Sequence, residues 1–261
     1  MSHGALAYAA ALDLFLRLDA VLSRALHADS AQKPFTVSPL FNLSQREEEP
    51  LLTPDAVYPW RITGLTSTLS EHLLKLSSAV GGVRFGKAIF TITTVATTPK
   101  EHPWAGQEDY ASLMARWDKG PSGELPPLHF LTPTTFRAGR HEQPFPLPRW
   151  VFGSLLAAWN AFSPHPLHIA KDLIEDKVAL SNWRGETRRL ELGGSRTVGF
   201  IGKFTYRVLD PSLELRRVIG LLTEFAFYAG VGWQTTHGLG QVRLEQSKRR
   251  PIAPIRSATA Q

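Results

Sequence analysis

The pattern of hydrophobic and polar residues divides the second half of the chain into six elements. Strand composition is found in residues 128–136, 187–192, 199–209 and 241–245. Residues 150–162 carry apolar side chains at helical spacing and follow Pro148, a residue favoured at helix starts. Ser212 is a predicted N-cap for a second helix, whose apolar stripe runs to Ala229. The order strand, helix, strand, strand, helix, strand predicts a ferredoxin-like unit.

The first half repeats this order without its opening strand. Residues 5–26 carry leucine and phenylalanine at helical spacing, which predicts one long helix. Strands are predicted at residues 35–43, 56–65 and 88–97. Between the last two strands, Thr68 and Glu71 have the spacing of a capping box, which predicts a helix that ends at Ser78.

These patterns place the chain in the α+β class, as two tandem ferredoxin-like domains. Turn-forming residues gather in KGPSGELPP, residues 119–127, and indicate the join. We expect an N-terminal domain at residues 1–121, a C-terminal domain at 122–250 and a flexible tail at 251–261. Because the first domain lacks its opening strand, its sheet is expected to have an unpaired edge. A partner, a homodimer contact or another segment of chain should cover that edge.

Composition excludes several classes of chemistry. The chain has 261 residues and no cysteine, which removes disulfides, thiolate metal sites and cysteine nucleophiles. Hydrophobic residues make up 43% and charged residues 20%, as in ordinary globular proteins. No apolar run has the length of a membrane span, so no membrane partner is expected. The lack of cysteine agrees with a cytoplasmic location.

The charge balance favours a polyanionic partner. The formal net charge is +6 and the pI is near 9.7. The basic residues are spread along the chain, as on an ordinary solvated surface. Charge alone therefore leaves both a nucleic-acid ligand and a merely basic surface open.

A glycine-rich loop after the last helix is the most informative motif. Gly230, Gly232, Gly238 and Gly240 form two G-x-G pairs around a polar segment. Glycine permits positive φ, and successive exposed N–H groups in such a loop suit phosphate. The loop leaves a helix and enters a strand, the reverse of a dinucleotide-binding loop. The structural alternative is that Gly230 caps the helix and Gly240 makes a turn.

The loop GVGWQTTHGLGQV, residues 230–242, resembles the C-terminal signature of the CRISPR-associated endoribonucleases that process repeat RNA. These enzymes belong to the RAMP superfamily and contain two ferredoxin-like units. Supporting segments in the same order are residues 26–40, HPWAG at 102–106 and FLTPTTFR at 130–137. The resemblance implies cleavage of repeat RNA without a metal or other cofactor. A ribose 2′-hydroxyl attacks the adjacent phosphate, which leaves a 2′,3′-cyclic phosphate and a 5′-hydroxyl.

The resemblance also implies site residues. The family often has a histidine at the end of its first helix and a lysine shortly downstream. His27 and Lys33 match these positions, as proton-transfer group and phosphate stabiliser. The family's tyrosine has only Tyr8 as its match, more than about five helical turns from His27, so the acid partner is unnamed. Without the resemblance, His27 fits better as a histidine favoured by the dipole at a helix C-terminus.

His237, inside the glycine loop, is the rival catalytic candidate. For RNA binding, we expect the four loop glycines to meet backbone phosphates through their amides. A basic wall is expected from Arg137, Arg140 and Arg149, with Lys203 facing RNA from a strand. Trp233 fits either a base-stacking residue or a core residue.

Two functions follow from the resemblance. The first is an endoribonuclease that releases guide RNAs for a CRISPR effector complex. The second is a non-catalytic RNA-binding subunit of such a complex, which would keep the loop and lose the acid–base pair.

Overall fold

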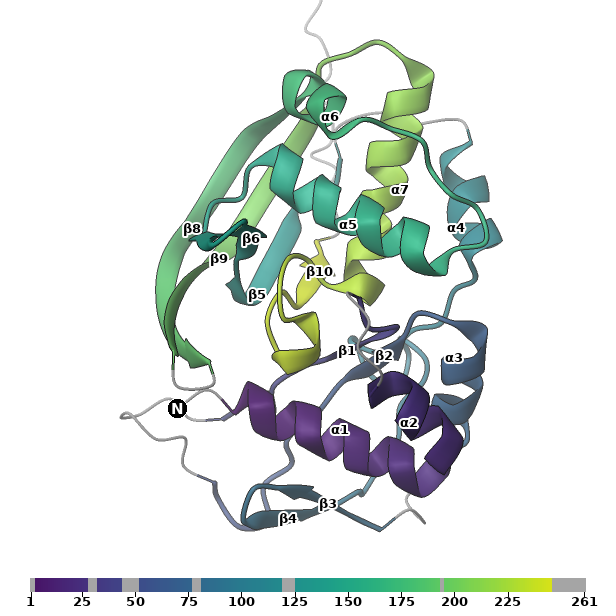
Figure 1. Cartoon of the computed structure of the whole chain (residues 1–261), viewed down its shortest axis with the longest axis vertical. Coiled ribbons are helices and arrows are strands. Elements are labelled where there is room, and N and C mark those ends of the chain that lie inside the picture. The colour runs from purple at the N-terminus through teal and green to yellow at the C-terminus, as the bar shows by residue number, and fades with distance from the viewer. Residues whose placement is uncertain are drawn as a thin grey trace, which may run out of the picture.

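The computed structural model describes residues 3–27, 32–43, 52–76, 81–118, 125–192 and 195–245. Figure 1 shows two groups of elements stacked along the long axis of the molecule. The first group holds α1 to β4, and the second holds β5 to β10 together with α4 to α7. Among the described residues, no helix has the length and apolar character needed to cross a membrane.

The second unit is the ferredoxin-like fold that the sequence predicts. Its core elements are β5 (Leu128–Thr134), α5 (Pro148–Phe162), β8 (Val178–Leu192), β9 (Ser195–Val208), α7 (Leu213–Ala229) and β10 (Val242–Leu244). The strands form an antiparallel sheet in the order β10-β5-β9-β8. The predicted helix starts are confirmed, with Pro148 at the first turn of α5 and the Ser212 hydroxyl accepting from the Leu215 N–H at 3.4 Å.

Two short strands of this unit were not predicted, and strands β8 and β9 are longer than predicted. A short hairpin follows β5, formed by β6 (Phe136–Ala138) and β7 (His141–Gln143). Helix α6 (Lys171–Lys177) precedes the sheet's edge strand. Strands β8 and β9 are longer than predicted, because β8 begins at Val178 instead of residue 187 and β9 at Ser195 instead of residue 199. The missed part of β8 lies at the edge of the sheet and carries several polar residues, which weakens the pattern that predicts a strand.

The first unit begins with two helices, where one was predicted. Helix α1 (Gly4–Leu18) ends at Asp19, which has extended backbone angles, and α2 (Ala20–His27) follows. The Asp19 carboxylate accepts hydrogen bonds from the Val21 and Leu22 N–H groups at 2.7 and 3.1 Å. These bonds lower the pKa of Asp19 and cap the second helix. The capping aspartate therefore breaks the predicted helix.

The remaining elements in the first half of the chain are β1 (Phe35–Val37), β2 (Ile62–Gly64), α3 (Ser67–Leu74), β3 (Gly82–Phe85), β4 (Ala88–Thr91) and α4 (Tyr110–Trp117). Of these, β1, β2, α3 and β4 are shorter than predicted, and β3 and α4 were not predicted. In the described residues, β1 pairs with β2, and β3 pairs with β4. Helix α3 is capped by Thr66, whose hydroxyl accepts from the Leu69 N–H, so the capping box predicted at Thr68 is wrong. The expectation that a partner or another segment of chain covers an unpaired edge of the first sheet stays a prediction.

Each unit has its own hydrophobic core, and α4 joins the second one. The first core gathers apolar residues of α1, β1, α3 and β3 around Phe15 and Phe35. The second packs α5 and α7 on the sheet and includes Leu113 of α4. Gly220 of α7 lies under Trp117, since a Cβ there would come within 2.1 Å of the indole ring. The predicted boundary between residues 121 and 122 stays a prediction, and the predicted tail at 251–261 lies outside the described residues.

A buried arginine joins the two units. Arg61, one residue before β2, is 9% exposed, and its guanidinium lies 4.3 Å from the Phe227 ring centroid. Its Nε donates to the Trp104 carbonyl at 2.9 Å, and its Nη1 donates to Gln241 Oε1 at 3.4 Å. Burial lowers the pKa of Arg61 to about 10, so the side chain stays charged at neutral pH. Its partners on α7 and before β10 hold the second unit against the first.

Arg61→Ala should lower the free energy of unfolding by about 2–4 kcal/mol, because it leaves a cavity and removes donors from buried acceptors. Urea denaturation measures the change. The matched control is Arg217→Ala on the exposed side of α7, for which about 0.5 kcal/mol or less is expected. Equal effects for the two variants would contradict a special role of Arg61.

Candidate functional site

The glycine loop requires its glycines for backbone geometry. Gly230, Gly232, Gly238 and Gly240 all have positive φ, between 64° and 90°. A Cβ on Gly240 would lie 2.0 Å from the Val231 carbonyl oxygen. The loop folds back on itself at this point, since the Val231 N–H donates to the Gly240 carbonyl at 2.9 Å. Both G-x-G pairs thus serve one tight crossing of the chain.

Most of the loop amides that we expected to meet phosphate are already bonded within the protein. The Gly232 N–H donates to Ser154 Oγ at 3.2 Å. The Gly230 and Gly240 N–H groups donate to the Ala226 and Pro133 carbonyls. The folded loop thus satisfies these three backbone donors internally, and phosphate binding by the loop glycines stays a prediction.

The loop lies against the first unit. A short 3-10 helix, η2 (Thr235–His237), contacts α1 and β1, as Figure 1 shows for the loop above α1. The His237 ring stacks on the Tyr8 ring of α1, with centroids 4.3 Å apart and planes 20° apart. Gly238 packs on Pro39, which a Cβ would approach to 3.1 Å. The loop therefore places His237 at the boundary between the units.

His237 has the electronic state of a proton acceptor at neutral pH. Its side chain is half-buried, and burial lowers its pKa below the ordinary value of 6.5. Its Nδ1 lies 2.9 Å from Thr236 Oγ1. The imidazole is therefore neutral and held by a stacked ring and a hydroxyl.

Lys33 lies at the end of the helix that carries His27. Its Nζ donates to the Leu26 carbonyl at 2.8 Å, and α2 ends one residue later, at His27. The His27 side chain lies outside the described part of the structure. The Lys33 ammonium thus contacts the backbone of the residue before His27, so the two predicted catalytic positions lie close together. The same contact also places an ammonium group on a helix C-terminus, which is stabilising.

The predicted basic wall is split. Arg137 and Arg140 lie on the hairpin of β6 and β7 and are exposed. The Arg137 guanidinium covers the Trp233 ring at 4.7 Å, so that face of the ring is occupied in this structure. Arg149 is paired with Asp172 at 2.9 Å and also with Glu175. Those carboxylates raise the pKa of Arg149 and neutralise its charge, so it links α5 to α6.

Lys203 lies on β9, opposite His129 of β5, and forms an ion pair with Glu245. The sequence analysis missed His129 here, and it also missed Arg61 at the junction. A single arginine within the apolar segment YPWRITGL is the signal that could have indicated a buried Arg61.

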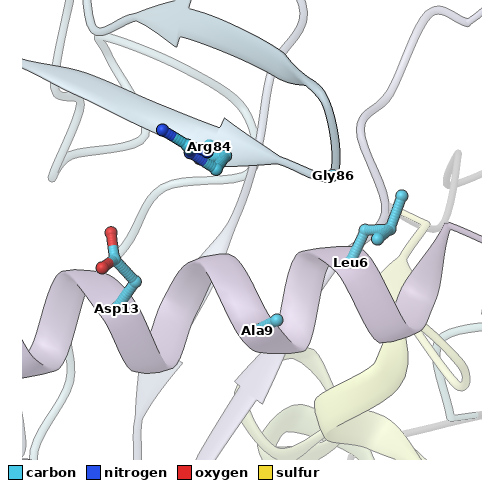
Figure 2. Close-up of a pocket in the computed structure, with 5 residues that line it drawn as sticks. All are labelled: Leu6, Ala9, Asp13, Arg84 and Gly86. Atoms are coloured by element: carbon cyan, nitrogen blue, oxygen red, sulfur yellow. The ribbon is translucent and has the colours of Figure 1, made fainter.

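A hollow of about 290 Å³ lies beside α1, on the side that faces the hairpin of β3 and β4 (Figure 2). Its lining consists of Leu6, Ala9, Asp13, Arg84 and Gly86. Asp13 also pairs with Arg17 at 3.2 Å. This lining offers one paired carboxylate and one arginine, a set poorly suited to acid–base cleavage of RNA.

Comparison with solved structures supports the two-unit architecture. The product complex of Thermus thermophilus Cas6 matches with a TM-score of 0.75 and 28% identity. The match covers 93% of this chain and 93% of that one. The predicted tandem ferredoxin-like fold is confirmed.

Sequence relatives agree. A CRISPR-associated endoribonuclease Cas6 of Mycobacterium tuberculosis is 26% identical over 244 residues, which cover 91% of this chain and 72% of the relative. The Cas6 of Streptococcus thermophilus is 29% identical over 122 residues, 46% of this chain, and that match spans only half of the relative.

Two family models match most of the chain. The model described as CRISPR Cas6 N-terminal domain matches residues 2–115. The model described as CRISPR-associated endoribonuclease Cas6 matches residues 128–242, which include β5 and the whole glycine loop. This chain belongs to the Cas6 family of CRISPR-associated endoribonucleases.

Proposed function

We propose that this protein cleaves CRISPR precursor RNA within its repeats, by attack of a ribose 2′-hydroxyl on the adjacent phosphate and without a metal ion. Family membership over both units supports the endoribonuclease class. The observation that carries the proposal is the contact of Lys33, two residues before β1, with the Leu26 carbonyl at the end of α2. The products are a 2′,3′-cyclic phosphate and a 5′-hydroxyl, and the released fragments serve as guide RNAs.

The reaction needs three groups. A base removes the 2′-hydroxyl proton, an acid protonates the 5′-oxygen as it leaves, and a cation stabilises the phosphorane. We assign proton transfer to His27 and charge stabilisation to Lys33. The ammonium of Lys33 lies beside the Leu26 carbonyl, close enough to the end of α2 to act on a phosphate held there.

His237 is the alternative proton acceptor. Its pKa is lowered by burial, so it is neutral at neutral pH, the state that a base requires. Its stacking on Tyr8, however, uses the tyrosine as a packing partner. We therefore assign His237 to holding the loop on α1, with catalysis as the role to be tested.

RNA binding is proposed for the surface beside the loop. Arg137 and Arg140 project from one exposed hairpin, and Trp233 lies under Arg137. An RNA base can replace the guanidinium on the indole ring while Arg137 moves to a phosphate. Arg149 is left out of this surface, because α6 carboxylates neutralise it.

His27→Ala should reduce the single-turnover cleavage rate of repeat RNA by about 10²–10⁴-fold, since it removes a proton-transfer group. Cleavage by the unaltered protein should persist in EDTA and fail on RNA with a 2′-deoxy ribose at the cut. The control is His168→Ala, an exposed histidine outside the site. Normal cutting by the His27 variant would transfer the role to His237. Binding without cutting by the unaltered protein would identify a non-catalytic RNA-binding subunit.

Lys33→Met should slow cleavage by about 10²-fold, because it removes the cation while it keeps the apolar stem. Lys33→Arg should restore most of that rate. The matched control is Lys75→Met, since Lys75 also lies at a helix C-terminus in the first unit. A purely structural role predicts similar small losses of stability for both methionine variants and unchanged cleavage.

His237→Gln tests the protonation of the stacked histidine through stability. The folded-state pKa of His237 lies below its unfolded value of 6.5, so the unfolded chain binds more protons as the pH falls through that value. The stability that the neutral His237 ring contributes is complete above pH 6.5 and is lost as the pH falls through the lowered pKa of the folded state. The stability advantage of the unaltered protein over the variant should therefore shrink between pH 8 and pH 5, as measured by urea denaturation. A constant difference across this range would contradict a lowered pKa.

A further inference from the structure

Four basic side chains form one line across the second sheet. Arg243 of β10 lies opposite His129 of β5, His129 lies opposite Lys203 of β9, and Lys203 lies opposite Arg184 of β8. Directly opposite residues in antiparallel strands project from the same face. The strand register therefore sets Arg243, His129, Lys203 and Arg184 in a single line, here called the basic row.

The basic row lies on the face of the sheet turned away from its helices. Phe204 follows Lys203, and Phe130 follows His129, and both phenylalanines are buried in the core with α5 and α7. Because successive side chains of a strand point to opposite faces, the basic row points outward. Figure 1 shows α5 and α7 together on one side of the sheet.

The row carries a net positive charge that is accessible to a ligand. Arg184 and Arg243 are exposed, and the Lys203 side chain is 47% exposed. One carboxylate, that of Glu245, contacts both Lys203 and His129. It offsets one of the three permanent cations and leaves the arginines at the two ends of the row.

The dimensions of the row suit a polyanion. Neighbouring strands lie about 4.8 Å apart, so four strands span about 14 Å. Several consecutive nucleotides cover that length, whereas a small anion would contact one end of it. Extended arginine and lysine side chains bind phosphates without reading the sequence.

We propose that the basic row binds the phosphate backbone of the substrate RNA at a distance from the cut. This inference rests on the proposed function for the identity of the ligand. The row lies on the sheet of the second unit, whereas the residues proposed for proton transfer and charge stabilisation lie at the end of α2 in the first unit. The row thus provides a second contact, which lengthens the RNA segment that the protein holds.

The test is the double variant Arg184→Glu with Arg243→Glu. Its matched control is Arg216→Glu with Arg217→Glu, which makes the same charge change on exposed arginines of α7. The RNA probes are a full repeat with its flanking nucleotides and a short fragment centred on the cut. Both carry a 2′-deoxy ribose at the cut, so that binding is measured without cleavage. Thermal unfolding verifies that each variant is folded, and Arg184→Gln with Arg243→Gln replaces the first variant if it is not.

The row variant should bind the full repeat about tenfold more weakly than the unaltered protein does. The slope of log affinity against log salt should decrease in magnitude by about 1.4, the value for two lost single-strand phosphate contacts. Affinity for the short fragment and the rate of cutting of saturating cleavable RNA should be unchanged. The affinity of the control variant for the full repeat should differ from that of the unaltered protein by less than about threefold, the order of magnitude of a general charge effect.

Equal losses for the row and control variants, or an equal loss on both RNA probes, would overturn the proposal. So would unchanged binding of the full repeat. Cutting is measured separately with cleavable RNA. An unaltered protein that binds the full repeat through the row and never cuts would refute the proposed enzymatic function while it supports the row.

Discussion

The structure depends on a charge buried at the junction of its two units. Removing a guanidinium from water costs several kcal/mol unless polar groups and aromatic faces replace the lost hydration. For Arg61 the replacements come from both sides: Ser38 Oγ accepts from its backbone N–H, and the side chain reaches Trp104, Gln241 and Phe227. Because the second unit supplies Gln241 and Phe227, the buried charge is stable only when the units are docked. Docking in turn sets the glycine loop on α1.

The loop and the junction form one structural system. Gln241, which accepts from Arg61, also donates to the Val37 carbonyl at 3.4 Å and lies one residue after Gly240. A positive φ at Gly240 lets the chain cross over Val231 and enter β10 with this side chain pointing into the junction. The glycines thus shape the turn that holds His237 against Tyr8.

Ion pairing divides the basic residues into a group held by carboxylates and a group that is exposed. The net charge of +6 describes the total and says nothing about this division. Arg149 and Arg116 are held by carboxylates of neighbouring helices and strengthen helix packing. Arg137, Arg184 and Arg243 are exposed on the hairpin and the outer sheet face. These two surfaces lie at different places on the second unit.

Local patterns predicted the second unit well and the first unit less well. The βαββαβ order, the start of α5 at Pro148 and the cap at Ser212 all follow from short-range spacing, and the structure has them. In the first unit the apolar spacing continues through Asp19, so periodicity alone could not show that its carboxylate ends one helix and begins the next. Strand β3 and the first part of β8, residues 178–186, escaped prediction, because β3 has only four residues and β8 is an edge strand with several polar residues.

The sequence by itself determined the fold class, the family signature and the positions where glycine is needed, since backbone conformation and hydrophobic periodicity are local properties. Only the tertiary structure decided which groups act together. Strand register aligned His129 with Lys203, and the docking of the units placed Tyr8 on His237. The same folding used the amides of Gly232 and Gly240 internally. Contacts between residues far apart in the chain depend on packing and register, and no spacing along one strand or helix records them.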